Sequence, residues 1–118
     1  MFDVKHFSEE EFACPCCGYQ DMSLDFVEEL DKARSEAGVP FVISSGYRCE
    51  KHNEEVGGVS GSAHTKGLAV DIAVKSSSDR FKILQALIRR FDRIGISKNF
   101  IHVDWDHRKS KEVCWLYE

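Results

Sequence analysis

Two short segments of the chain combine the pattern of a β-strand with ionisable side chains. GLAVDIAV (67–74) is apolar and β-branched, as expected of a strand buried on at least one face, yet it contains Asp71. In FIHVDW (100–105), period-2 alternation places His102 and Asp104 on one face of a strand and apolar residues on the other. The fold must therefore include strands with ligand-type side chains directed to one side.

Helix signals lie on both sides of these strands. Ser8 with Glu11 three residues later forms a capping-box pattern, which predicts a short helix through about Phe12. Apolar residues at helical spacing between Ser23 and Gly38 predict a longer helix. The serines 76–78 cap a third predicted helix. Its expected apolar face consists of Phe81, Ile83, Leu84, Leu87, Ile88 and Phe91, with Arg89 and Arg90 outside.

The remaining segments complete the expected order of elements. FVISS (41–45) predicts a strand, residues 46–58 hold about two helical turns, and the small polar residues 58–66 are expected to form a loop. Two further strands are predicted at ISKNFIHVDW (96–105) and EVCWLY (112–117). The order helix, helix, strand, helix, strand, helix, strand, strand indicates an α+β fold with helices covering a small, mainly antiparallel sheet. We expect residues 1–118 to form a single domain.

Charge and hydropathy exclude several classes of partner. The net charge is −4, and acidic and basic residues are mixed along the chain, so we expect no nucleic-acid partner. No apolar run approaches the roughly 20 residues of a membrane helix, and the first residues show no leader pattern. From the sequence we expect a monomer without membrane insertion that is cytoplasmic as synthesised.

Three residues form a candidate metal site. His64 and Asp71 lie seven residues apart, at the end of a glycine-rich loop and inside a strand, which differs from the helical HExxH pattern. If their strands are neighbours, His64, Asp71 and His102 supply two nitrogens and one oxygen and leave a fourth position open to water. That arrangement is typical of catalytic zinc. Taken singly, each residue is more often a surface or satisfied polar residue.

Three segments occurring in order carry a resemblance to a known family. SGYR (45–48), SAHTKGLAVDI (62–72) and FIHVD (100–104) together resemble the signature segments of the zinc D-alanyl-D-alanine carboxypeptidase family. This family includes phage endolysins and cell-wall peptidases, and it shares its fold with the hedgehog signalling domain. HFSEEEFAC (6–14) and SLDFVEELDKAR (23–34) resemble its small-domain branch, so the resemblance spans about residues 6–104.

The resemblance implies roles for individual residues. His64, Asp71 and His102 correspond to the zinc ligands, and Arg48 to the arginine that binds substrate and polarises its carbonyl; a structural salt bridge is the alternative for Arg48. Many members carry an Asp or Glu three residues before the last His ligand, where this chain has Asn99.

The catalytic base is therefore a separate question. Asp104 is the candidate replacement on the His102 strand face, and its rival role is to orient a ligand imidazole. Ser62 is a candidate for shaping the ligand loop and for contacting substrate. His52, Asp106 and His107 are weaker candidates, expected on the solvated surface.

The five cysteines do not form a complete metal motif in the sequence. Cys14, Cys16 and Cys17 are clustered, whereas Cys49 and Cys114 are single. Reduced thiols are the default interpretation, and a second metal or a disulfide from the cluster to Cys49 remains open.

Three functions follow for comparison. The first is a zinc peptidase that cleaves D-alanine-containing peptides of bacterial peptidoglycan, as in a phage or prophage lysis enzyme released to the wall. The second is a non-catalytic zinc domain of the same fold that binds peptides or proteins. The third is an interaction module in which the cysteine cluster binds the metal.

Overall fold

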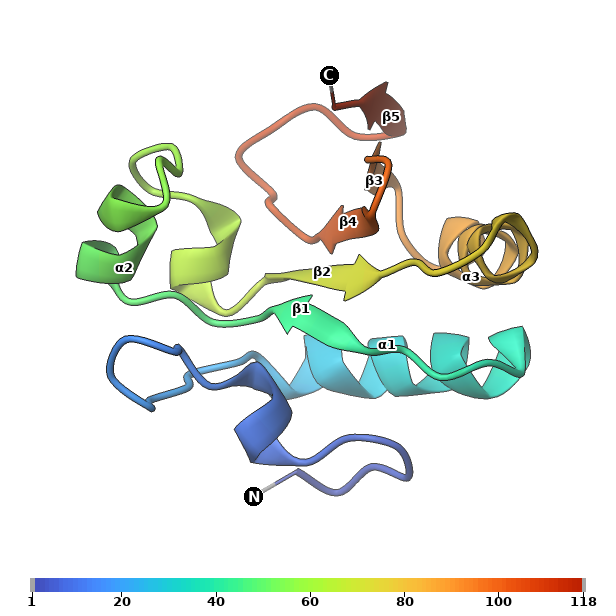
Figure 1. The fold of residues 1–118 in the computed structure, drawn as a ribbon, viewed down its shortest axis with the longest axis horizontal. Helices are drawn as coiled ribbons and strands as arrows, with labels where there is room; N and C mark the ends of the chain where they lie inside the picture. Colours follow the sequence, from blue (N-terminus) through green and yellow to red (C-terminus); the bar gives the residue numbers. More distant parts are fainter. Residues whose placement is uncertain (1, 118) are drawn as a thin grey trace.

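The computed structural model describes residues 2–117, in which helices cover a five-stranded sheet (Figure 1). The sheet order is β1-β2-β4-β3-β5, and all neighbours are antiparallel except β3 and β5, which run parallel. The predicted α+β class with a mainly antiparallel sheet is confirmed. In chain order the elements are η1 (Glu9–Phe12), α1 (Leu24–Ala37), β1 (Ile43–Ser45), α2 (Glu50–Glu55), η2 (Ala63–Lys66), β2 (Ala69–Ala73), α3 (Ser77–Ile88), β3 (Arg93–Ile96), β4 (Phe100–Asp104) and β5 (Val113–Leu116), where η denotes a 3-10 helix.

One face of the sheet forms the hydrophobic core with α1 and α3. Figure 1 shows α1 running below β1 and β2, and α3 near the right-hand end of the sheet. Alternation along β2 and β4 directs the apolar side chains to this face and leaves Asp71, His102 and Asp104 for the other. The buried core side chains from these elements are Phe26, Val27, Leu30, Ala33, Val70, Ile72, Ile83, Ala86, Leu87, Ile94, Ile101 and Val103.

The helix ends follow the sequence signals. The Ser23 side chain accepts a hydrogen bond from the Phe26 N–H at the start of α1, and Gly38 ends that helix with φ +70°. Ser76 caps α3 in the same way through the Asp79 N–H. Within residues 2–117, no helix combines the length and apolarity needed to span a membrane.

One predicted strand is in fact a hairpin. Residues 96–105 were expected to form a single strand, but β3 ends at Ile96, residues 97–99 turn, and β4 begins at Phe100. The Ser97 N–H donates to the Phe100 carbonyl (2.9 Å) and closes the turn. The sequence pattern missed β3 because its four residues, RIGI, contain a charged residue and a glycine.

The predicted apolar face of α3 was too wide. Phe81 is 66% exposed and Ile88 65% exposed, whereas Ile83, Ala86 and Leu87 are buried. Each residue advances about 100° around a helix, so Phe81 and Ile88 point roughly 100° or more away from Ile83 and Leu87. The sheet and α1 cover only the narrow stripe around the buried residues.

Candidate metal centre

The register between β2 and β4 brings two of the predicted ligands together. Asp71 lies directly opposite His102 in the antiparallel ladder, on the sheet face away from the core. Side chains at directly opposed positions have their Cβ atoms about 5 Å apart. As a result, His102 Nδ1 is 2.9 Å from Asp71 Oδ1, and both residues are only 8% exposed.

The third predicted ligand comes from a short helical turn rather than a loop. His64 lies in η2, where the Ser62 hydroxyl oxygen accepts from the His64 backbone N–H (3.2 Å). Gly67 ends the turn with φ +71°, and a Cβ there would lie 2.0 Å from the Asp21 carbonyl oxygen. Glycine at 67 therefore allows the turn to pack against residue 21 and lead directly into β2.

Hydrogen bonding fixes the orientation of the His64 ring. Its Nδ1 lies 2.8 Å from the Gly46 carbonyl oxygen, which can only accept, so Nδ1 carries the proton. The lone pair is then on Nε2, which lies 3.5 Å from Asp71 Oδ1. A backbone carbonyl on the other ring nitrogen is the usual support for a metal-binding histidine.

The residues present fit a zinc ion. One ligand atom each from His64, Asp71 and His102 lies within 4.8 Å of the other two, and all three residues are buried. Two imidazole nitrogens and one carboxylate oxygen, facing a pocket, match the three protein ligands of a catalytic zinc site. The structure therefore brings together the three residues that the sequence nominated.

The electrostatics of the centre favour positive charge. Burial raises the pKa of the Asp71 carboxyl, but hydrogen bonds with His102 and His64 outweigh it and hold that pKa well below its usual range. Burial lowers the pKa of His102, but its hydrogen bonds with Asp104 and Asp71 raise it above its usual range. Both carboxylates thus stabilise a cation at this position, and a metal ion can replace the proton on His102 Nδ1.

Arg48 lies at the edge of the same pocket, before α2. Its Nη2 is 3.6 Å from Asp71 Oδ2, its Nε donates to the Ser45 hydroxyl, and its Nη1 donates to Asn53 Oδ1 (both 3.2 Å). Asn53 is buried, and its Nδ2 donates to the Val59 carbonyl (2.8 Å). Sequence reasoning missed Asn53, because a polar residue in a short helix gives no signal of a contact with a side chain five residues earlier.

Asp104 is buried behind His102, and both of its carboxylate oxygens are occupied. Oδ2 lies 2.7 Å from His102 Nε2, which must therefore donate its proton there. Oδ1 accepts from Arg93 Nε (2.7 Å) and from the Asp106 backbone N–H (2.9 Å). Burial raises the Asp104 pKa, but the hydrogen bonds from His102, Asp106 and Arg93 lower it below its usual range.

Aromatic side chains from β4, β5 and the following residue form another wall of the pocket: Phe100, Trp115 and Tyr117. The Trp115 ring centroid lies 5.6 Å from that of His102. A Cβ on Gly95 would lie 2.6 Å from Trp115 and Tyr117 ring atoms, so glycine at this position makes room for both rings.

Of the other residues singled out in the sequence, some line the pocket and some lie on the surface. Ser62 is buried and lines the pocket, whereas Asn99 is exposed in the β3–β4 turn and does not line it. The expectation of a solvated Asp106 was wrong. It is 3% exposed, because its carboxylate accepts from Arg108 Nε (2.8 Å) while Arg108 Nη2 donates to the Gly61 carbonyl (2.6 Å).

A second group of ligand-type side chains lies outside this pocket. The Sγ atoms of Cys14, Cys17 and Cys49 are all within 4.8 Å of one another. Burial raises the pKa of the Cys14 thiol, but hydrogen bonds from the backbone of Cys49, Cys16 and Cys17 lower it to about 7. The residue that the sequence left single, Cys49, thus joins the cluster.

Comparison with known protein families identifies the family of the chain. The family model of peptidase M15 matches residues 5–104, a range that includes the candidate ligands His64, Asp71 and His102. No relative was found among curated proteins. The chain therefore belongs to the M15 peptidases, the zinc D-alanyl-D-alanine carboxypeptidase family.

Proposed function

We propose that this protein hydrolyses peptide bonds in the D-alanine-containing stem or cross-link peptides of bacterial peptidoglycan. The observation that carries the proposal is the convergence of His64, Asp71 and His102 beside Arg48 in one pocket. Membership of a zinc peptidase family supports it. These three residues would hold the zinc ion, which, when bound, polarises a carbonyl and activates water.

Arg48 is the proposed substrate-binding side chain. A guanidinium has five N–H donors, and the hydrogen bonds to Ser45 and Asn53 use only two of them. Those two bonds hold the guanidinium plane in place, and the remaining donors suit a peptide carboxylate or a developing oxyanion. Because Arg48 Nη2 lies 3.6 Å from Asp71, the substrate group that it binds would lie beside the metal ligands.

Ser62 and the aromatic wall are proposed to contact the peptide. The Ser62 oxygen accepts from the His64 N–H, so its own O–H hydrogen is available to donate to a substrate carbonyl. Trp115 and Tyr117 offer flat apolar surface in the same pocket.

For Asp104 the contacts favour the orienting role over that of catalytic base. Its hydrogen bond with His102 Nε2 leaves Nδ1 as the metal-binding atom, and Arg93 keeps the carboxylate ionised. We propose this as its main function. The carboxylates among the pocket-lining residues are Asp71 and Asp104, so Asp104 is also the candidate for a proton acceptor other than a ligand.

The test is digestion of purified peptidoglycan by the zinc-loaded chain, followed by mass spectrometry of the released fragments. We expect release of D-alanine or stem peptides, loss of activity after chelation, and recovery after zinc is added back. His107→Ala is the matched control for His64→Ala, because His107 is exposed and does not line the pocket. It should retain activity. A protein with one zinc in the His64 site that releases nothing contradicts the proposal.

That negative result would favour a non-catalytic zinc domain that binds peptides. The observation in favour of this second function is that hydrogen bonds already occupy both Asp104 oxygens, while Asn99 is not among the residues that line the pocket. Isothermal titration with a stem peptide would then show binding without hydrolysis.

A further inference from the structure

The loop after η1 directs two thiols to the same side. The Gly18 N–H donates to the Cys14 carbonyl (2.7 Å), and the Cys14 N–H donates to the Tyr19 carbonyl (2.8 Å). Gly18 adopts φ +75°, which allows the chain to turn back directly after Cys17. Cys14 and Cys17 thus form a Cys-x-x-Cys turn, the local geometry from which thiolates chelate metal ions.

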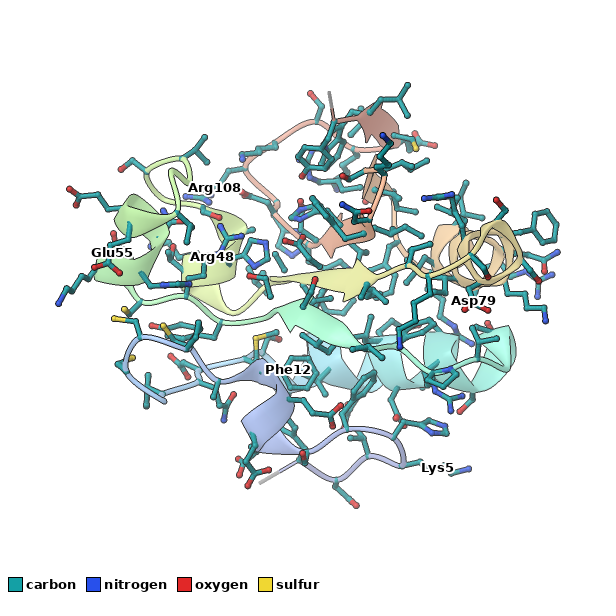
Figure 2. The ribbon with its side chains drawn as sticks, in the orientation of Figure 1. Lys5, Phe12, Arg48, Glu55, Asp79 and Arg108 are labelled. Carbon is teal, nitrogen blue, oxygen red and sulfur yellow. The ribbon has the colours of Figure 1, made fainter. Side chains whose placement is uncertain are left out.

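A third thiol reaches this turn from a distant part of the chain. Cys49 is the N-cap of α2, and its Sγ accepts from the His52 N–H (3.4 Å). Its Sγ lies 3.7 Å from that of Cys14, 35 residues earlier. Figure 2 shows sulfur atoms gathered beside the N-terminal loop, below the helix that carries Glu55.

The spacing of the sulfurs suits a tetrahedral metal. Thiolates bound to zinc at about 2.3 Å along tetrahedral directions lie about 3.8 Å from one another, whereas a disulfide joins sulfurs about 2 Å apart. The Cys14 thiol donates to Cys49 Sγ at 3.7 Å, a separation that excludes a disulfide and also fits two ligands of one tetrahedral metal ion. The ligand set is all sulfur, in contrast to the nitrogen and oxygen ligands of His64, Asp71 and His102.

We propose that Cys14, Cys17 and Cys49 hold a second, structural zinc ion, separate from the catalytic centre. Each thiol gives up its proton to solvent as the sulfur binds the metal. Cys16 lies on the same loop and interacts with the Cys49 thiol, which makes it the candidate for the fourth position of a closed site.

The location of this site gives it a positioning role. Cys49 directly follows Arg48, whose N–H donates to the His64 carbonyl (3.2 Å), and the Gly46 carbonyl accepts from His64 Nδ1. The Tyr47 N–H also donates to the Phe12 carbonyl (2.9 Å). Segment 46–49 is therefore bonded both to the N-terminal region and to the catalytic centre, and a metal at Cys49 would hold its far end to the 14–18 turn.

The test is the zinc content of the full chain, purified under reducing conditions and measured by elemental mass spectrometry. We expect two zinc ions per chain in the unmodified protein. His64→Ala should retain one, and so should Cys17→Ser, whose side chain is exposed and whose replacement leaves the core intact. Cys114→Ser is the matched control, with two ions expected, because Cys114 lies on β5 outside the cluster.

Cobalt substitution separates the two sites without relying on activity. Thiolate-to-cobalt charge-transfer absorption should persist in His64→Ala and disappear in Cys49→Ser, with circular dichroism verifying that each variant is folded. One zinc ion per chain that Cys17→Ser leaves in place and His64→Ala removes would overturn the proposal. The proposal would also be overturned if the intact chain, purified under reducing conditions, had a mass two hydrogens below that of the reduced chain and contained a Cys14–Cys49 disulfide.

Discussion

The two ligand clusters of this protein both contact the segment that carries Arg48, but they are built from different kinds of structure. His64, Asp71 and His102 are buried, and two of them lie on neighbouring strands whose register fixes their distance. The cysteine cluster lies on a turn and a helix N-cap, with Cys17 exposed. The comparison indicates that strand register brings the first cluster together, whereas a turn and a helix N-cap bring the second together.

The largest expected effect comes from His64→Ala. Removing one of three protein ligands should abolish zinc binding at the catalytic centre, which is worth several kcal/mol of transition-state stabilisation, and lower kcat/KM for peptidoglycan peptides by about 10³-fold. Steady-state kinetics and zinc analysis measure the two effects. A variant with full activity would contradict the assignment of His64 as a ligand of a catalytic zinc ion.

Arg48→Lys should lower kcat/KM by about 100-fold while zinc is retained. Lysine cannot reproduce the bonds to Ser45 and Asn53 and still present paired donors to the substrate. Arg89→Lys makes the same change on an exposed residue after α3 and should leave kinetics unchanged. If Arg48→Lys had wild-type kinetics, Arg48 would be a structural side chain only.

Asp104→Asn distinguishes orientation from proton transfer. Loss of the carboxylate behind His102 should weaken zinc affinity by about 10- to 100-fold, as is usual for such supporting groups. Competition with a chelator of known affinity measures this change. Unchanged zinc affinity with a large fall in kcat would instead identify Asp104 as the catalytic base.

The smallest expected effect is on stability, and it comes from Asp106, whose partner Arg108 bonds to the Gly61 carbonyl in the loop before His64. The hydrogen bonds from Arg108 lower the Asp106 pKa to about 2, against about 3.9 in an unfolded chain. A lowered pKa adds stability above pH 4, and this is lost as pH falls toward 2. We expect about 1 kcal/mol, less than the shift alone suggests, because Arg108 is 55% exposed.

Urea unfolding of the native protein and of Asp106→Asn measures this contribution. The difference between the two free energies of unfolding should be largest near pH 6 and should shrink between pH 4 and pH 2. A difference that is independent of pH would show that the carboxylate charge contributes no stability.

The sequence by itself determined which residues are able to form the candidate metal centre. Period-2 alternation in FIHVDW placed His102 and Asp104 on one face, and helix caps at Ser23, Gly38 and Ser76 marked the ends of α1 and the start of α3. These features were predictable because they depend on a residue and its near neighbours in the chain. The resemblance of the signature segments was confirmed by the match to the M15 family.

Only the tertiary structure decided which of those residues meet. The register that sets Asp71 opposite His102, the approach of Cys49 to Cys14, and the burial of Asp106 all join segments far apart in the sequence or depend on how a loop folds back. The exposure of Phe81 has the same origin, since a helix pattern shows which residues share a face but not how much of that face a neighbour covers. Contacts between distant segments depend on sheet order and loop geometry, and local spacing carries no information on either.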